Sequence, residues 1–312
     1  MRVLVTGGAG FIGSHLCEAL LARGDAVTVL DNFNDFYDPE LKRRNVRALE
    51  GAELVEGDVR DRELVEGLFE SGAFDAVVHL AAMAGVRPSV ADPLLYEDVN
   101  VRGTLILLEA ARQQPGLRFV FASSSSVYGG NTEVPFKETD DIPRPVSPYA
   151  ATKRAGELLA YTYHHLHDLP VTCLRFFTVY GPRQRPEMAI HAFVRKVLAG
   201  EPLPFFGDGT TRRDYTYVDD IVDGVVRAID RCAGYEIYNL GESATTSLAE
   251  LVEMIGDVCG EEVRLDRQPL QPGDVLVTYA DVAKARARLG YAPGIGVREG
   301  LERFVAWYRE TR

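Results

Sequence analysis

Two residues with the chemistry of an acid–base pair, a tyrosine and a lysine, lie four positions apart in the stretch SPYAATKRAGE (147–157). Ser147 is suited to cap a helix and Pro148 to be its first residue, which predicts a helix that starts here. Tyr149 and Lys153 would then lie one turn apart on the same face. A free tyrosine has a pKa of about 10, and lowering it by about three units requires about 4 kcal/mol of preferential stabilisation of the phenolate. The positive charge of Lys153 acts in that direction, but the same spacing also occurs on exposed helix surfaces, so other motifs must decide.

A glycine-rich turn, VTGGAGFIG (5–13), follows the first apolar segment and opens a helical pattern. Its glycines at every third position would allow a tight turn, close approach of the backbone to a pyrophosphate, and packing of the helix against a sheet. Asp31 ends the second apolar segment, where a carboxylate can bind the adenosine ribose of a dinucleotide. Asn32 follows it, instead of an arginine that could bind a 2′-phosphate, so the pattern favours NAD over NADP. The alternative for Asp31 is an ordinary turn residue at the end of a strand.

Alternating strands and helices would position these residues. Short β-branched runs predict strands, and longer segments with helical periodicity lie between them. The predicted strands are 2–6, 26–30, 52–57, 75–80 and 117–123, and the predicted helices are 11–24, 60–72 and 101–114. Repeated strand–helix–strand units indicate an α/β fold with a Rossmann-like, doubly wound parallel sheet. The regularity ends after 171–181, so we expect a dinucleotide-binding domain over 1–175 and a smaller mixed α/β lobe over 176–312, with some exchange of chain between them.

The composition excludes several classes of protein. The chain has 312 residues and a formal net charge of -12, which argues against a surface for nucleic acid or an anionic membrane. Its four cysteines, Cys17, Cys173, Cys232 and Cys259, are far apart, so we expect buried thiols in a reducing compartment and no metal site. No signal peptide and no apolar stretch long enough to cross a bilayer is evident, so we expect a cytoplasmic protein.

Six motifs occur in the order found in extended short-chain dehydrogenase/reductases that act on nucleotide sugars, and the chain resembles that family over nearly its whole length. They are TGGAGFIG (6–13), GDVRD (57–61), HLAA (79–82), SSSSVYG (123–129), YAATK (149–153) and RRDYTYVDD (212–220). Three further stretches resemble UDP-glucuronate 4-epimerases: DNFNDFYDPELKRRN (31–45), AAMAGVRPS (81–89) and RFFTVYGPRQRPEMA (175–189). The resemblance implies NAD as cofactor, a UDP-sugar as substrate, and a homodimer packed through two helices of each subunit.

The same resemblance implies a catalytic set and a reaction. Ser124, four residues before Tyr128 in SSSSVYG, occupies the family's Ser/Thr position and completes a set with Tyr149 and Lys153. Tyr149 would take the proton of the C4 hydroxyl while hydride passes from C4 to NAD. The 4-keto sugar would then rotate and be reduced from its other face, which inverts C4 without net consumption of NAD.

Further positions that match the family's motifs would contact NAD. Asp58 and Val59 would contact the adenine, Ala81 would lie along the cofactor, and Asn100 would support the site from its helix. The full set of expected cofactor residues is Gly7, Gly10, Phe11, Ile12, Gly13, Asp31, Asn32, Asp58, Val59, Leu80, Ala81, Ala82, Asn100, Tyr149 and Lys153.

The lobe over 176–312 would bind the sugar nucleotide. Arg213 matches the family's diphosphate-binding arginine, and Arg185 and Arg87 lie in the motifs where the sugar carboxylate would bind. A surface ion pair is the alternative for each of these arginines. The other expected substrate residues are Ser124, Ser125, Ser126, Tyr149, Thr178 and Asp274, of which Asp274 would bind a hydroxyl of the nucleotide ribose.

This chain differs from related enzymes at two places, one of which bears on the type of reaction and the other on the identity of the sugar. The family's 4,6-dehydratases and UDP-glucuronate decarboxylases typically carry acidic residues after the Ser/Thr position, whereas Ser125 and Ser126 stand here, which favours epimerisation. Arg183 and Gln184 stand where glucuronate epimerases often have Trp-Gly, which leaves UDP-glucose or a UDP-N-acetylhexosamine open as substrates.

Two other interpretations are a UDP-glucuronate decarboxylase or dehydratase, which would share the 4-keto intermediate, and a catalytically inactive dinucleotide-sensing or nucleic-acid-binding relative. The second of these is disfavoured by the intact Ser124–Tyr149–Lys153 set and by the net charge of -12.

Overall fold

The fold is that of a computed structural model, which describes residues 1–142, 144–270 and 275–311. Its main element is a seven-stranded sheet with the order β11-β6-β5-β4-β1-β2-β3, and every neighbouring pair is parallel. The chain builds β1, β2 and β3 outward in one direction and then returns to place β4 on the other side of β1. In doubly wound sheets, ligands bind at this reversal, outside the carboxyl ends of the strands. The strands are β1 (Arg2–Thr6), β2 (Ala26–Asp31), β3 (Glu53–Glu56), β4 (Ala76–His79), β5 (Arg118–Ser124), β6 (Val171–Phe176) and β11 (Tyr235–Leu240).

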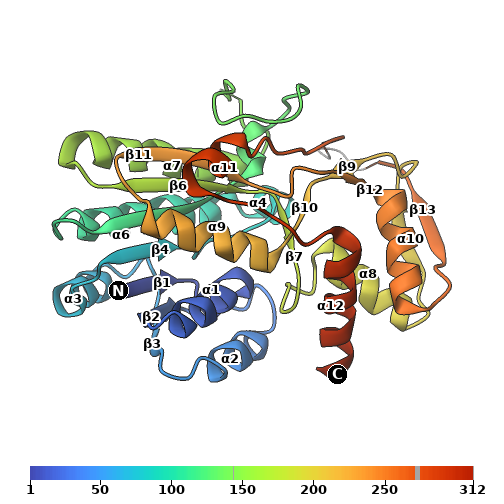
Figure 1. Ribbon diagram of the computed structural model, residues 1–312, viewed down its shortest axis with the longest axis horizontal. Helices are drawn as coiled ribbons and strands as arrows, with labels where there is room; N and C mark the ends of the chain where they lie inside the picture. The colour runs from blue at the N-terminus through green and yellow to red at the C-terminus, as the bar shows by residue number, and fades with distance from the viewer. Residues whose placement is uncertain (143, 271–274, 312) are drawn as a thin grey trace.

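Helices cover both faces of this sheet, as Figure 1 shows. Side chains of β1 alternate between the two faces: Val3 and Val5 belong to the core shared with α1 and α9, and Leu4 belongs to the core shared with α3, α6 and α7. The helices are α1 (Phe11–Ala22), α9 (Val218–Asp230), α3 (Arg62–Gly72), α6 (Gly103–Ala111) and α7 (Pro148–His167). The predicted α/β fold with a doubly wound parallel sheet is confirmed.

A smaller mixed lobe lies at the right of Figure 1, around α8, α10 and α12. The lobe and the segments leading to it contain three short two-stranded sheets, β8 with β13, β7 with β10 and β9 with β12. Its elements are β7 (Thr178–Tyr180), α8 (Ala189–Leu198), β8 (Leu203–Phe206), β9 (Arg212–Arg213), β10 (Tyr215–Tyr217), β12 (Thr246–Ser247), α10 (Leu248–Cys259), β13 (Leu265–Gln268), α11 (Ala283–Leu289) and α12 (Val297–Glu310). The predicted domain boundary between residues 175 and 176 falls at the end of β6. Beyond it in the chain, α9 and β11 pack with the large sheet, so part of the segment after residue 176 belongs to the dinucleotide-binding half. The division into two domains at 175/176 stays a prediction.

Helix boundaries differ from the predicted ones where capping decides them. The helix predicted over 60–72 begins at Arg62, because the Asp61 side chain accepts a hydrogen bond from the Leu64 N–H (3.1 Å) and caps it. The helix predicted over 101–114 is a π-helical turn, η1 (Asp98–Arg102), that continues into α6 and ends at Ala111. The remaining short elements are α2 (Pro39–Arg47), α4 (Val86–Ala91), α5 (Pro93–Glu97) and the 3₁₀ turn η2 (Ser125–Tyr128).

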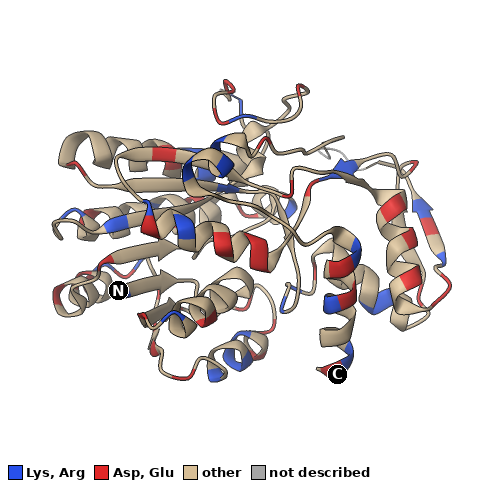
Figure 2. Ribbon diagram, in the orientation of Figure 1, with Lys and Arg blue, Asp and Glu red and all other residues tan. Residues whose placement is uncertain are grey.

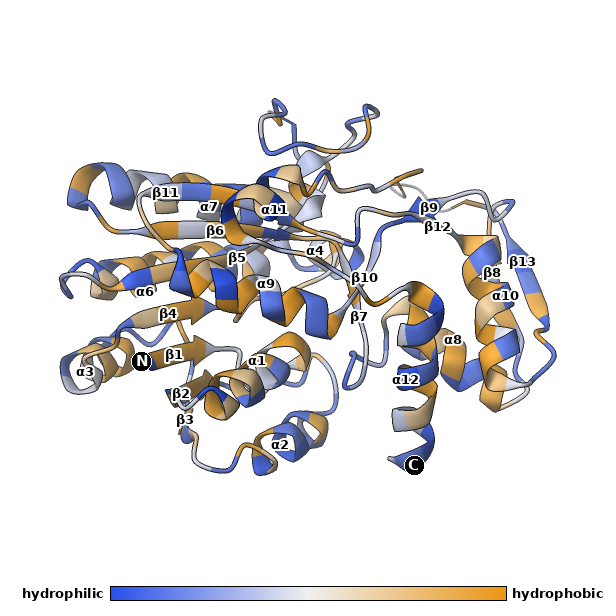
Figure 3. Ribbon diagram, in the orientation of Figure 1, coloured by the Kyte–Doolittle hydropathy of each residue, from blue (hydrophilic) through white to orange (hydrophobic). Residues whose placement is uncertain are grey.

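Hydropathy and charge follow this layered arrangement. Figure 3 shows helices such as α9 and α12 with both hydrophobic and hydrophilic residues, as expected for helices that cover a core on one side. Figure 2 shows basic residues gathered on α2, but Arg43 pairs with Glu56 (3.1 Å) and Arg47 with Glu40 (2.8 Å), so acidic neighbours partly neutralise that helix. Within the described ranges, no helix has the length and apolar character needed to span a membrane.

Candidate active site

A hollow opens at the carboxyl ends of β1 and β4, where the strand order reverses. Fourteen of the fifteen expected cofactor residues line it, namely Gly7, Gly10, Phe11, Ile12, Gly13, Asp31, Asn32, Asp58, Val59, Leu80, Ala81, Ala82, Tyr149 and Lys153. The remaining one, Asn100, is buried behind the wall. Its amide donates to Met83 O (2.9 Å) and Thr152 Oγ1 (3.1 Å) and accepts from Met83 N (2.8 Å), so it supports the wall from η1 as expected.

The glycine-rich turn has the shape that a pyrophosphate site requires. Gly7 has φ +71°, and a Cβ there would lie 2.7 Å from Ala81 N; at Gly13 a Cβ would lie 2.2 Å from Gly7 O. A side chain at Gly7 would therefore push the turn away from the segment that follows β4, and a side chain at Gly13 would push α1 away from the turn. Gly10 is the N-cap of α1 and makes no side-chain cap, so the amide groups of the first turn can bind an anion.

Two carboxylates, those of Asp31 and Asp58, line the hollow where β2 and β3 end. Asp31 is buried and accepts hydrogen bonds from Ala9 N (3.1 Å) and Phe33 N (2.9 Å), which hold it at the end of β2. Burial raises the pKa of Asp31, and these two bonds oppose that change. Asp58 accepts from Asn32 Nδ2 (2.8 Å), and mainly its hydrogen bonds with Arg60 lower its pKa to about 2. Asp58 is therefore ionised at neutral pH.

Some residues of this hollow could not be recognised from the sequence. Lys42 is only 5% exposed although it lies in the polar helix α2, and its Nζ donates to Asn34 O (3.0 Å) and Asn34 Oδ1 (2.9 Å). Its burial beside Tyr37 follows from the fold of the whole 31–45 segment, and no periodicity signals it. Phe36, Met83 and Met188 also line the hollow.

The predicted catalytic residues lie together at the end of β5 and the start of α7. Ser147 accepts from Ala150 N (3.1 Å) and caps α7 as predicted, which places Tyr149 in the first turn. Burial raises the pKa of Tyr149, whereas its hydrogen-bonding contact with Ser124 and the positive charge of Arg185 act to lower it. Lys153 Nζ donates to Ala122 O (2.8 Å), and burial lowers its pKa to about 7. The sequence pointed to Lys153 as the cation acting on the phenol; in the structure the positive charge that lowers the pKa of Tyr149 is that of Arg185, from another lobe, and an effect of Lys153 stays a prediction.

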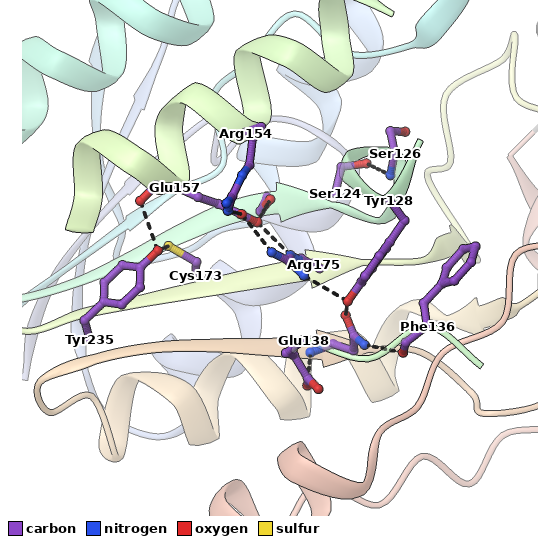
Figure 4. A network of polar contacts seen from close by, with 12 residues as sticks. Ser124, Ser126, Tyr128, Phe136, Glu138, Arg154, Glu157, Cys173, Arg175 and Tyr235 are labelled. Carbon is purple, nitrogen blue, oxygen red and sulfur yellow. Dashed lines mark hydrogen bonds and ion pairs between the residues drawn. The ribbon is translucent and has the colours of Figure 1, made fainter. Parts of the chain in front are cut away.

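A buried polar network fixes α7 behind these residues (Figure 4). Glu157, one turn after Lys153, accepts from Arg175 Nε (2.8 Å) and Nη2 (2.9 Å) and from Ser123 Oγ (2.6 Å). Burial would raise the pKa of Glu157, but the hydrogen bonds and charge of Arg175 lower it overall. Arg175 Nη1 also donates to Tyr128 OH (3.0 Å). The network therefore ties α7 to β6, to η2 and to β5, whose last residue is Ser124.

A second hollow adjoins the first and contains the expected substrate residues that lie outside the catalytic set. Arg87, Ser125, Ser126, Thr178, Arg185 and Arg213 line it, and Asp274 lies outside the described residues. Arg185 lines both hollows; its guanidinium lies over the Phe36 ring (5.4 Å), and its Nε is 2.8 Å from Glu187 Oε1. The guanidinium of Arg87 lies over the Phe206 ring (5.7 Å). Cations from α4, β9 and the 181–188 loop thus converge on one cleft.

Arg183 and Gln184, the pair that departs from Trp-Gly, do not line either hollow. Arg183 pairs with Glu18 on α1 (2.6 Å). Gln184 is buried; its Nε2 donates to Val179 O (3.1 Å) and its Oε1 accepts from His191 N (3.1 Å). The replacement of Trp-Gly by Arg183 and Gln184 therefore changes how the loop is held in place. The cleft itself is lined by other side chains, among them Arg185.

No metal is indicated at this site: across residues 1–142, 144–270 and 275–311, no three His, Cys, Asp or Glu side chains are grouped so that they could hold an ion.

Comparison with known proteins agrees with this geometry. Residues 3–241 match the NAD dependent epimerase/dehydratase family. UDP-glucuronate 4-epimerase 3 of Arabidopsis thaliana is 44% identical over 98% of this chain and 76% of its own length. UDP-glucuronic acid 4-epimerase of Bacillus cereus, solved with UDP-glucuronic acid and NAD, is 37% identical with a TM-score of 0.93 over 100% of both chains. UDP-glucose 4-epimerase of Thermotoga maritima, solved with UDP-glucose, is 35% identical with a TM-score of 0.94 over 100% of this chain and 99% of its own. Because the family match spans most of the chain and the relatives are similar over nearly all of it, this chain belongs to the NAD dependent epimerase/dehydratase family.

Proposed function

We propose that this protein is an NAD-dependent 4-epimerase of UDP-sugars, with UDP-glucuronate as substrate and UDP-galacturonate as product. The observation that carries the proposal is the position of Arg185, which lines both hollows and acts electrostatically on Tyr149. A cation in this place suits a sugar that carries a carboxylate next to the reacting carbon. The UDP-glucuronate epimerases among the relatives support it, and identification of the product from UDP-glucuronate tests it.

The residues of the first hollow fit NAD. The uncapped N-terminus of α1 would hold its pyrophosphate, Asp31 its adenosine ribose, and Asp58 and Val59 its adenine. When bound, NAD supplies a reversible hydride acceptor and, in its oxidised form, a positive charge. Lys153 would bind the nicotinamide ribose, because its buried Nζ lies at the inner end of the hollow beside Ala122.

Tyr149 would move the proton. Its phenolate oxygen would take the proton of the C4 hydroxyl, and Ser124 would hydrogen-bond the C4 oxygen. The phenol would return the proton after the 4-keto sugar has rotated in the cleft. Burial raises the pKa of Tyr149, so the phenolate depends on nearby positive charge, and Arg185 supplies part of it. The side chains of Phe36, Tyr96 and Met83 pack around Tyr149 and reduce its exposure to water.

Plain epimerisation is favoured over loss of the carboxylate. Ser125 and Ser126 line the cleft with neutral hydroxyl groups, which are poor acids and bases at neutral pH. Arg185 could hold the sugar carboxylate so that its bond to C5 stays out of alignment with the C4 ketone, the alignment that decarboxylation needs. UDP-glucose is the second candidate substrate, since the likeness to the Thermotoga maritima enzyme favours it.

Cofactor preference should follow from Asp31. We expect NAD to bind at least about tenfold more tightly than NADP, because a 2′-phosphate would be repelled by this carboxylate and would lose its hydrogen bond. Isothermal titration calorimetry with both dinucleotides measures the ratio of the NAD and NADP affinities. Asp31→Asn should reduce this ratio, because it removes the negative charge at nearly constant side-chain volume. Equal affinities in the unmodified protein would contradict the role of Asp31.

We also propose that the protein is a homodimer that packs through α6 and α7. Large apolar side chains are exposed on this layer: Leu158, Tyr161 and Leu166 on α7 are 53%, 50% and 64% exposed, and Leu94 on the adjoining α5 is 79% exposed. Apolar groups clustered in this way mark an interaction surface. Sedimentation equilibrium should give a dimer, Leu166→Asp should shift it toward monomer, and Leu265→Asp, in the other lobe, should not. A monomer at micromolar concentration would contradict this proposal.

The cysteines support a cytoplasmic location. All four are buried and present as free thiols, as expected, and burial raises the pKa of Cys17 to about 12, which makes it unreactive. Thiols of this kind suit a reducing compartment.

A further inference from the structure

The loop that carries Arg185 is attached to the cofactor-binding helix α1. Arg183 Nη2 is 2.6 Å from Glu18 Oε2, and His15 Nε2 donates to Pro182 O (2.9 Å). His15 and Glu18 are three residues apart in α1, so they lie on one face of that helix and contact consecutive residues of the loop. The two contacts span 165 and 167 positions of the chain.

We propose that Arg183 and Glu18 are positioning residues: they clamp the 181–188 loop to α1, hold Arg185 in the cleft, and so make recognition of a sugar carboxylate depend on the cofactor lobe. This inference rests on the proposed function, in which Arg185 binds the carboxylate of UDP-glucuronate.

A continuous set of contacts connects the clamp to the cofactor hollow. Phe11, the first residue of α1, lines that hollow, and its ring lies edge-on to the His15 ring (6.0 Å between centroids). His15 in turn binds Pro182. Burial, followed by the charge of Arg183, lowers the pKa of His15, so its imidazole is neutral at neutral pH and donates from Nε2. A change at the start of α1 therefore reaches the loop through packed side chains.

Backbone conformation and hydrogen bonds restrict the 181–188 loop in addition to the contact between Arg183 and Glu18. Gly181 has φ +145°, and a Cβ there would lie 2.6 Å from Val218 Cγ1, so this position needs glycine. Gln184 N donates to Gly181 O (3.1 Å), which closes a turn around Pro182 and Arg183. The buried Gln184 side chain fixes the other end of this turn to β7 and α8. Arg185 follows directly, so its position is set by the turn and by what holds the turn against α1.

Arg183 itself is held at a cost in folding free energy. Its φ is +63°, in the left-handed region that arginine rarely adopts. Its Nη1 is buried and has no hydrogen-bond partner among the residues that the structure describes. A residue that combines backbone strain with an unsatisfied donor is better explained by positioning than by stability.

Binding to the NAD-loaded protein tests the clamp, with Tyr149→Phe as the background so that the sugar is not turned over. Arg183→Ala should weaken UDP-glucuronate binding about three- to fivefold, the upper part of the range expected for one partly exposed ion pair, and should change UDP-glucose binding less than about twofold. Glu18→Arg combined with Arg183→Glu should restore most of the affinity. Arg23→Ala, which breaks the Arg23–Asp230 pair between α1 and α9 (2.9 Å), is the matched control and should leave both affinities unchanged.

A double-mutant cycle separates positioning from stability. On an Arg185→Ala background, Arg183→Ala should cause no further loss of UDP-glucuronate affinity, because the group that it positions is gone. Additive losses, or equal losses for UDP-glucuronate and UDP-glucose, would overturn the clamp. If Arg185→Ala alone changed nothing while UDP-glucuronate was still epimerised at C4, the clamp would fail and the proposed function would stand. Formation of a different product would instead overturn the proposed function.

Discussion

Replacement of Tyr149 by phenylalanine is expected to lower turnover by about 10²-fold or more, because it removes the group that we propose takes and returns the C4 proton. Folding and NAD binding should survive. The ring keeps its edge-on contact with Tyr96 (6.3 Å between centroids) and its place beside Met83 and Val99. Single-turnover kinetics with the UDP-sugar measures the effect.

Tyr161→Phe is the matched control for this variant. Tyr161 lies twelve residues further along α7 and is half exposed, so loss of its hydroxyl should leave turnover unchanged. Turnover near the unmodified level in Tyr149→Phe would place the acid–base group elsewhere.

Arg175→Met is expected to destabilise the protein by about 3 kcal/mol, the lower end of the range for breaking a buried ion pair, because it leaves the buried Glu157 carboxylate with only the partly exposed Arg154 as a cation (2.8 Å). Both side chains are at most 1% exposed, so water cannot replace the lost partner. Replacing Glu157 with leucine in the same chain should recover much of the loss, since no uncompensated charge remains. Unfolding in urea, followed by circular dichroism, measures the difference in free energy of unfolding.

The control for this prediction is Arg62→Ala, which breaks an exposed pair with Glu66 on α3 (2.6 Å). Exposed pairs contribute little, so the free energy of unfolding should hardly change. A loss in Arg175→Met no larger than that of this control would contradict the importance of the buried pair.

The sequence predicted the elements whose signals are local. Ser147 and Pro148 mark the start of α7, and the glycines of VTGGAGFIG mark the turn between β1 and α1, because capping and close backbone approach restrict the residue types at those positions. The five strands predicted over residues 2–123 were found within one residue at each end, whereas the short strands from β8 onward were not predicted. The start of α3 was missed by two residues, since Asp61 could be assigned to the helix or to its cap on spacing alone.

Contacts between distant segments could not be predicted in this way. Glu157 and Arg175 lie on α7 and β6, and nothing in the spacing of either element identifies the other as its partner. The cation acting on Tyr149 was assigned to Lys153 because it is one turn away, whereas the charge that acts on its pKa in the structure is that of Arg185, 36 positions along the chain. The inward position of Lys42 likewise depends on packing of the whole 31–45 segment. Arg183 and Gln184 were connected with sugar specificity by their place in a motif, but their side chains turn away from the cleft.

Identification of the product formed from UDP-glucuronate tests the central claim most directly. The protein is incubated with NAD and UDP-glucuronate labelled in the sugar ring, and the sugar nucleotides are followed by nuclear magnetic resonance. The structure, with Tyr149 and Arg185 around one cleft and neutral Ser125 and Ser126 at its wall, predicts UDP-galacturonate as the product with the carboxylate retained. UDP-xylose as the main product, with release of carbon dioxide, would contradict it.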